Sequence, residues 1–168
     1  MAKKKKTMAM NNPAEPAPAF NVRFLYAFCN DVAAMRQFYT ELLGMKEGAF
    51  LDNENWAWVT YKSEGFEIMF FRWDHPLPIE TRWAWQPGEA KVESVPLMSF
   101  SLHYPWDQFV SAVKRLREAA TRAQSEKPTW RQGSYWGWTV ADPMGHTIEV
   151  YSTPPKPPKE GEPPQWID

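Results

Sequence analysis

Glu149 has the surroundings in which a side chain could do chemistry. It lies in Thr147–Tyr151, a β-forming segment whose residues alternate between apolar and polar. Ile148 and Val150 therefore face one way and Glu149 faces the other. Burying a carboxylate without a partner costs free energy, so this second face either meets solvent or lines a site. In a site, Glu149 could pair with a cationic ligand or act as an acid or base with a raised pKa.

The segment Leu97–His103 carries another row of polar side chains. Ser99, Ser101 and His103 alternate along it and share one face. His103 could reach an ion near Glu149, but a divalent cation is held well only by three or more protein ligands. A strand-end histidine in an ordinary hydrogen bond is the favoured interpretation of His103. Two further histidines are expected at the surface: His75 and His146.

A tight turn holds Glu149 in place. Residues Asp142–Gly145, of sequence DPMG, have turn chemistry, because an aspartate opens the turn, a proline pre-sets φ at its second position and a glycine closes it. Tyr135–Ala141 before the turn and Thr147–Tyr151 after it both alternate as strands do. We therefore expect a strand, a turn and a strand here.

The same order of elements occurs twice along the chain. The first half predicts a strand, a helix capped by Asn30 and two or three strands, over Val22–Cys29, Asp31–Leu43, an uncertain strand in Glu47–Asn55, Trp56–Tyr61 and Phe66–Trp73. The second half predicts the same order over Leu97–His103, Trp106–Ala123, Thr129–Gln132, Tyr135–Ala141 and Thr147–Tyr151. Two successive βαβββ modules form an internal repeat and indicate an α+β fold.

Composition sets the boundaries of this domain. Residues 1–19, with four consecutive lysines, and the proline-rich residues 153–168 are expected to be tails. A single domain is predicted over residues 20–152, with modules at about 20–73 and 97–152 and a connector at 74–96. A chain of this size can bury roughly two-thirds of its unfolded surface.

Charge, hydropathy and cysteine content narrow the possible partners. The formal net charge of −1 gives no reason to expect a nucleic-acid partner. No apolar stretch is long enough to span a membrane, and the N-terminal segment lacks the apolar region of a signal peptide. Cys29 is the only cysteine, so an intrachain disulfide is excluded and a cytoplasmic location is expected.

Three stretches of the sequence resemble the glyoxalase/bleomycin resistance/extradiol dioxygenase superfamily, which has the vicinal oxygen chelate fold. They are Asn30–Met45, the SAVKRL of Ser111–Leu116 and the hairpin Trp136–Tyr151 with its DPMG turn. The resemblance covers about residues 20–152. It implies two paired modules whose strands curl into an open barrel or cup with the helices outside. It also implies a homodimer, in which pairing covers exposed sheet edges.

Metalloenzymes of this family hold a divalent ion at the cup floor with His or Glu on the first and last strands of each module. The matching positions here are Phe24, Ile68, Ser99 or Ser101, and Glu149. Glu67 is expected on the opposite face of its strand. One glutamate and two hydroxyls are too few to hold such an ion, so no metal and no other cofactor is expected.

Aromatic residues are abundant in the presumed cup. The chain has 10 tryptophans, and aromatic side chains serve both as buried core and as stacking platforms for planar or cationic ligands. Core packing is expected to account for half or more of them. Trp83 and Trp85 could form a lid from the connector. The candidate ligand-binding residues are Phe24, Tyr26, Phe28, Trp56, Trp58, Ile68, Phe70, Ser99, Ser101, His103, Glu149 and Tyr151.

Three functions fit these observations. The favoured hypothesis is a binding protein of the bleomycin-resistance type that sequesters or carries an aromatic or cationic small molecule. A metal-dependent lyase, isomerase or dioxygenase is the second, and Glu149 with His103 is its only support. The third is a protein-interaction or regulatory module that uses its proline-rich tails and exposed tryptophans.

Overall fold

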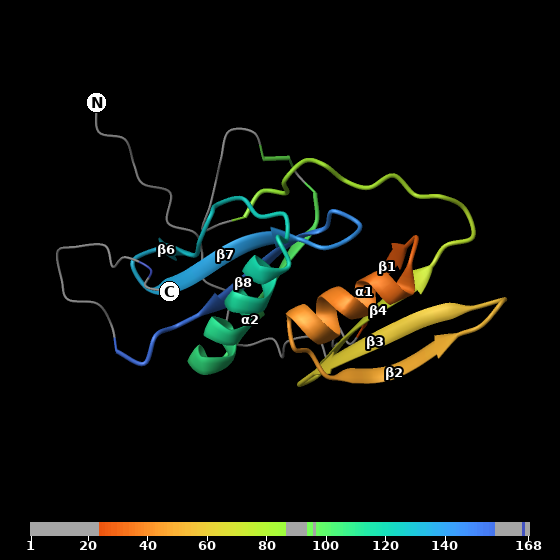
Figure 1. The fold of residues 1–168 in the computed structure, drawn as a ribbon, viewed down its shortest axis with the longest axis horizontal. Coiled ribbons are helices and arrows are strands. Elements are labelled where there is room, and N and C mark those ends of the chain that lie inside the picture. The colour runs from red at the N-terminus through yellow and green to blue at the C-terminus, as the bar shows by residue number, and fades with distance from the viewer. Residues whose placement is uncertain (1–23, 87–93, 96, 157–165, 167–168) are drawn as a thin grey trace, which may run out of the picture.

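Two four-stranded sheets lie side by side in the computed structural model (Figure 1), which describes residues 24–86, 94–95, 97–156 and 166. In the first sheet the strand order is β1-β4-β3-β2, and in the second it is β5-β8-β7-β6. The strands are β1 Phe24–Cys29, β2 Glu47–Asp52, β3 Ala57–Ser63, β4 Phe66–Arg72, β5 Ser99–His103, β6 Thr129–Arg131, β7 Tyr135–Ala141 and β8 Thr147–Ser152. Each module pairs its first and last strands in parallel and the others antiparallel. The predicted α+β repeat is confirmed, and the sheets do not close into a barrel.

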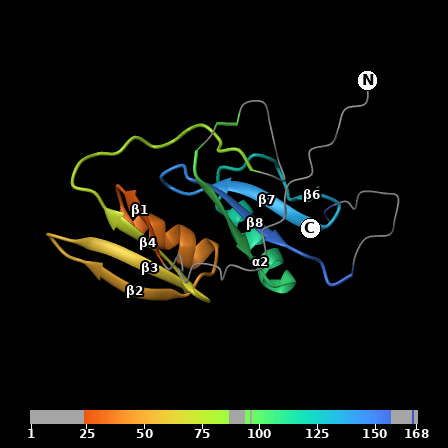
Figure 2. The ribbon, with the colours of Figure 1, turned by 180° about the vertical axis from the view of Figure 1, so that it is seen from behind.

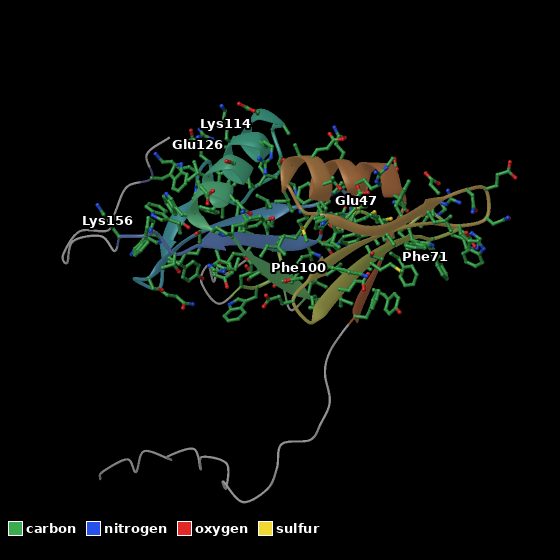
Figure 3. All side chains as sticks on the ribbon, turned by 90° about the horizontal axis from the view of Figure 1, so that it is seen from below. Glu47, Phe71, Phe100, Lys114, Glu126 and Lys156 are labelled. Carbon is green, nitrogen blue, oxygen red and sulfur yellow. The ribbon has the colours of Figure 1, made fainter. Side chains whose placement is uncertain are left out.

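Helices cover one side of both sheets (Figure 3). The first is α1, Val32–Arg36, which continues as the π-helix η1, Gln37–Leu42, where the Leu43 N–H donates to the Phe38 carbonyl. The N-cap is Asp31 rather than Asn30, because the Asp31 carboxylate accepts hydrogen bonds from the backbone N–H groups of Ala33 and Ala34. The second helix is α2, Trp106–Glu118. It ends earlier than predicted, since Ala120 adopts a positive φ of 51°.

The hydrophobic core lies between these helices and the sheets. In the first module the Tyr39 ring stacks on Phe70, with ring centroids 4.3 Å apart. In the second, Ile148 and Val150 of β8 are fully buried together with Phe109 and Leu116 of α2. Phe100 and Leu102 pair with Ile148 and Val150 in the parallel register. The helix-covered face predicted for the second module is therefore confirmed.

The turn between β7 and β8 joins the two modules. Asp142 is buried there, and its carboxylate accepts a hydrogen bond from the Tyr39 hydroxyl of η1 at 3.0 Å. The turn closes at Gly145, which has a φ of +82°. A Cβ at this position would lie 1.9 Å from the Glu80 carbonyl oxygen of the connector. Only glycine allows both this backbone conformation and this close approach.

Trp166, in the proline-rich C-terminal segment, belongs to the core. Trp166 is 9% exposed, and its ring contacts Trp106, Phe109 and Trp136 at centroid distances of 5.3–5.9 Å. Trp166 lies within the predicted tail 153–168 and nevertheless packs in the core. The predicted N-terminal tail, 1–19, lies outside the described residues. Among the described helices, none combines the length and hydropathy needed to cross a membrane.

Candidate functional site

Glu149 lies at the centre of the face of the second sheet that the helices do not cover. The register pairs it with Ser101 of β5 and with Thr139 of β7. Glu149 is only 6% exposed. Its Oε2 accepts from the Ser101 hydroxyl at 2.8 Å, and its Oε1 accepts from the Tyr135 hydroxyl at 3.2 Å. The sequence-based expectation that this carboxylate shares a face with Ser101 is confirmed.

The cationic partner of Glu149 is Arg131, from the short strand β6. Arg131 Nη1 donates to Glu149 Oε1 at 2.7 Å, and the arginine is 2% exposed. Its Nη2 donates to the Thr139 hydroxyl at 3.1 Å, and its Nε to the Thr129 hydroxyl at 3.0 Å. A buried ion pair needs such additional hydrogen bonds to offset its desolvation. Glu149 thus has a protein cation beside it.

Gly137 makes room for this ion pair. It lies in β7 next to both side chains, and a Cβ at Gly137 would lie 2.8 Å from Arg131 Cδ and 2.9 Å from Glu149 Oε1. Any larger residue would push the two charged groups apart. The neighbouring Tyr135 has a pKa raised to about 12, first by burial and then by the negative charge of Glu149. Its hydroxyl therefore remains a hydrogen-bond donor at neutral pH.

The connector after β4 covers the same face of the second sheet (Figure 2). The Ala84 N–H donates to the Thr147 hydroxyl at 2.9 Å, and the Thr139 hydroxyl donates to Gln86 Oε1 at 2.7 Å. Trp83 and Trp85, which were predicted to form a lid, do not lie together over this face. Trp83 stacks against Arg122, whose Cζ is 4.2 Å from the ring centroid, and Trp85 is exposed.

The corresponding face of the first sheet is open and aromatic. Phe24, Tyr26 and Phe28 alternate along β1, and the register places them beside Glu67, Met69 and Phe71 of β4. Tyr26 is 61% exposed. The rings form a nearly continuous surface, which we call the aromatic face, in which Phe24 stacks on Tyr26, Phe28 contacts Phe71 and Trp73, and Trp56 contacts Phe71, at centroid distances of 4.8–6.3 Å.

Two candidate ligand-binding residues lie on the other side of this sheet. Ile68 and Phe70 are buried under the helices. Their predicted position in the cup is wrong because β1 and β4 pair with Phe24 opposite Glu67, which turns the odd-numbered residues of β4 to the open side. The same register places Glu67, which was expected on the opposite face of its strand, beside Phe24 on the face that the helices leave open.

Glu67 borders a shallow cavity at the edge of the aromatic face. The cavity has a volume of about 440 Å³, and Phe24, Lys62 and Phe66 also line it. Lys62 Nζ lies 3.9 Å from Glu67 Oε2, and the lysine is exposed. An exposed ion pair at this distance is weak. The cation beside the Glu67 carboxylate is therefore farther away and more exposed to water than the cation beside Glu149.

The remaining candidates divide between the two faces. Trp58 pairs with Phe71 and so belongs to the aromatic face, which Trp56 extends. Ser99, His103 and Tyr151 share the face of Glu149. Ser99 donates to the Trp85 carbonyl at 3.4 Å, and the His103 and Tyr151 rings lie 5.0 Å apart. The structure thus groups the candidates around two separate centres rather than one cup floor.

The donor set does not fit a divalent metal ion. By register, Phe24 lies beside Glu67 in the first module and Ser101 lies beside Glu149 in the second. The Arg131 guanidinium is hydrogen-bonded to the Glu149 carboxylate oxygen that such an ion would need as a ligand. Within the described ranges no group of three or more His, Cys, Asp or Glu side chains could hold a metal.

Arg131 is the functional residue that sequence reasoning missed. Its strand was predicted, and the alternation of Thr129, Trp130 and Arg131 places the first and third on one face. An arginine in a short strand beside Trp130 was the available signal. Local sequence cannot show which strand Arg131 meets, because β6 is hydrogen-bonded to β7 and the arginine reaches across β7 to β8.

Comparisons with known proteins agree with this fold. The family model of the glyoxalase/bleomycin resistance protein/dioxygenase superfamily matches residues 22–150. The fold is similar to that of a glyoxalase/bleomycin resistance protein/dioxygenase from Alicyclobacillus acidocaldarius, with a TM-score of 0.51 and 15% identity over 86% of this chain and 95% of that one. A domain with a similar description from Frankia sp. EAN1pec gives 0.55 and 17% over 83% and 100%. A lactoylglutathione lyase from Agrobacterium tumefaciens gives 0.51 and 16% over 81% and 96%. No curated protein matches the sequence.

Proposed function

The chain belongs to the glyoxalase/bleomycin resistance/dioxygenase superfamily, and from this premise we propose that it binds a planar aromatic or cationic small molecule without a metal ion. The single observation that supports the proposal best is the buried Arg131–Glu149 pair, which gives the second module an internal cation. The aromatic face of the first module offers a ligand exposed stacking groups instead. The metal-dependent enzyme considered above is disfavoured for the same reason.

The aromatic face has the chemistry that such a ligand needs. Tyr26, Phe28 and Trp56 are all exposed, so they offer stacking surface that is not used in the core. A ring that carries a positive charge gains further from the negative faces of these aromatic side chains. Glu67, at the edge of the aromatic face, supplies a carboxylate for a ligand cation.

The carboxylate expected to anchor a cation was Glu149, and in this proposal Glu67 takes that role. Both Glu149 oxygens already accept hydrogen bonds from Arg131, Tyr135 and Ser101. A ligand cation would have to displace Arg131, which would leave a buried charge without its partner. At Glu67 a ligand cation displaces only the exposed Lys62, at little cost.

Tryptophan fluorescence titration with two probes of nearly the same shape tests this proposal. One probe is the cation 1-methylquinolinium and the other is the neutral 1-methylnaphthalene. Glu67→Gln should weaken binding of the cation by about tenfold, as for the loss of one charge-assisted interaction, and leave the neutral probe unchanged. Glu149→Gln is the matched control in the second module and should alter neither affinity if the variant is folded.

Two results would contradict the proposal. If Glu149→Gln weakens the cation more than Glu67→Gln does, the anchor is in the second module. If neither probe quenches the fluorescence of the well-folded protein, the interaction-module hypothesis gains support. Elemental analysis after dialysis against zinc, manganese, nickel and iron tests the metal question separately, and about one retained ion per chain would overturn the assignment.

The homodimer remains part of this proposal. Strands β1 and β2 end the first sheet, and β5 and β6 end the second. Such edges offer unpaired backbone groups to a second copy. Light scattering after size exclusion should give twice the mass of 19.6 kDa. A monomer throughout the micromolar range would contradict it.

A further inference from the structure

A second cavity lies beside the turn between β7 and β8, away from the aromatic face. It has a volume of about 250 Å³ and is lined by Gly145, His146 and Thr147 of the turn and β8, by Glu80 and Ala84 of the connector, and by Leu97 and Met98 before β5. We propose that this cavity binds the carboxylate of a small apolar carboxylic acid, with the His146 imidazole as its main hydrogen-bond donor. This proposal goes beyond the function assigned to the aromatic face and does not depend on it.

His146 is held in one orientation by a buried carboxylate. Its Nδ1 lies 2.8 Å from Asp142 Oδ2. Because an ionised carboxylate only accepts, Nδ1 carries a proton, and Nε2 is the nitrogen left for a ligand. Asp142 itself is fixed by the Tyr39 hydroxyl at 3.0 Å and by the backbone N–H groups of Met144 and His146, both at 2.9 Å. The imidazole is therefore positioned before any ligand arrives.

The charges around His146 favour an anionic ligand group. Burial lowers the pKa of His146, but the hydrogen bond to Asp142 and its negative charge outweigh burial and raise that pKa above the ordinary value. The imidazolium then carries an Nε2 proton. The negative charge of Asp142 is already met by Tyr39, two backbone N–H groups and Nδ1, so it leaves the Nε2 proton available to a second acceptor.

The other titratable groups near the dyad do not cancel this preference. Burial raises the pKa of Tyr39 well above its usual range and that of Cys29 to about 11, so both are neutral at pH 7. The Glu80 carboxylate of the connector is paired with Arg82, whose Nε and Nη2 donate to it at 2.9 and 2.8 Å. Arg122 donates to the Thr81 and Glu80 carbonyls from the other side.

The rest of the cavity fits a small apolar body. Leu97 and Met98 are exposed although they are aliphatic, and Met98 is 63% exposed. The cavity is smaller than the 300–1,000 Å³ or so typical of drug-sized ligands, which favours a compact aryl or short-chain acid. Thr147 supplies a second donor: its oxygen accepts from the Ala84 N–H at 2.9 Å, and in the described part of the chain its hydroxyl hydrogen has no acceptor.

Imidazole NMR of the full chain tests this site directly, because the protein has only three histidines. The ¹H–¹³C signal that disappears in His146→Asn belongs to His146, and those of His75 and His103 serve as internal references. Benzoate should shift the His146 signal to saturation and leave the references in place. Benzamide, which has the same shape without the charge, should bind about tenfold more weakly. Affinity for benzoate should fall as the pH rises past the His146 pKa, since Nε2 then loses its proton.

An exposed substitution keeps the test independent of any effect of His146→Asn on folding. Met98→Asp places a carboxylate at the cavity wall and should weaken benzoate by about tenfold, whereas the neutral Met98→Gln should weaken it much less. Glu67→Gln should have no effect, which separates this site from the aromatic face. The proposal is overturned if benzoate leaves the His146 signal unchanged, if benzamide shifts it equally well, or if Met98→Asp and Met98→Gln behave alike.

Discussion

The two modules share one backbone plan but use it differently. Glu67 in β4 and Glu149 in β8 each lie beside a residue of the first strand of their module, Phe24 in β1 and Ser101 in β5, on the face that the helices leave open. Glu149 is buried with an arginine nitrogen 2.7 Å away, whereas the lysine nitrogen beside Glu67 is exposed and 3.9 Å away. A glutamate on the open face therefore forms a buried ion pair in the second module and a partly buried, weakly paired carboxylate in the first.

The residues on the outer strands explain the difference. The antiparallel partner of Glu67 is Lys62, and four residues before it Trp58 pairs with Leu51 of the outer strand β2. The antiparallel partner of Glu149 is Thr139, and four residues before it Tyr135 pairs with Arg131 of the outer strand β6. Leu51 supplies no charge, and Arg131 supplies the guanidinium. The connector also covers this face of the second module, through Ala84 and Gln86. Charge and cover act together, since an ion pair gains strength when water is removed.

Arg131→Ala should produce the largest effect and would test the contrast most severely. Removing one partner of a buried ion pair leaves an uncompensated charge, and we expect a loss of about 3–5 kcal/mol in the free energy of unfolding. Leu51→Ala, at the corresponding place in the first module, should cost less than about 1 kcal/mol because Leu51 is exposed. Urea denaturation of both variants measures this. Equal losses would show that the modules do not differ in the way described.

Trp166→Ala comes next and concerns the stability of the second module. The side chain fills a socket formed by three aromatic residues, so truncation should cost about 3 kcal/mol. Trp56→Ala on the aromatic face is the matched control and should cost less than about 1 kcal/mol, because Trp56 is 56% exposed. Thermal melts of the full-length variants are sufficient. A Trp166→Ala melt equal to wild type would mean that the C-terminal segment contributes nothing to folding.

Tyr39→Phe should have a smaller effect and tests the link between the modules. The variant keeps the ring that stacks on Phe70 but removes the hydrogen bond to the buried Asp142. We expect a loss of about 1–2 kcal/mol. Tyr26→Phe removes an exposed hydroxyl and serves as the control, with no measurable change. If both variants unfold at the same denaturant concentration, the Tyr39–Asp142 bond does not stabilise the contact between modules.

The smallest expected effect is a pH dependence carried by His146. Its pKa is raised in the folded protein, so the stabilisation is fully present below the ordinary pKa of about 6.5 and is lost as the pH rises through the folded-state pKa. The effect should remain below about 1 kcal/mol because the ring is partly exposed. Wild type should lose its advantage over His146→Gln as the pH increases above this range. An advantage that grows with pH would reverse the assigned sign.

Alternation along single strands predicted the faces of the second module better than those of the first. Along Thr147–Tyr151 and Leu97–His103, alternation correctly separated the helix-covered residues from Ser101 and Glu149. In the first module the same reasoning misplaced Ile68, Phe70 and Glu67. Alternation tells which residues of one strand share a face, but not which faces of two strands coincide. A shift of one residue between β1 and β4 exchanges the sides.

The sequence by itself determined the local structure and the repeat, because turn chemistry at Asp142–Gly145 and apolar periodicity act over a few residues. Only the tertiary structure decided what Glu149 meets, since Arg131 lies 18 residues earlier and reaches it across a strand. It also decided that Trp166 packs beside Trp106, 60 residues away along the chain. Such contacts depend on register and on chain closure, which are properties of the assembled sheets rather than of any segment read alone.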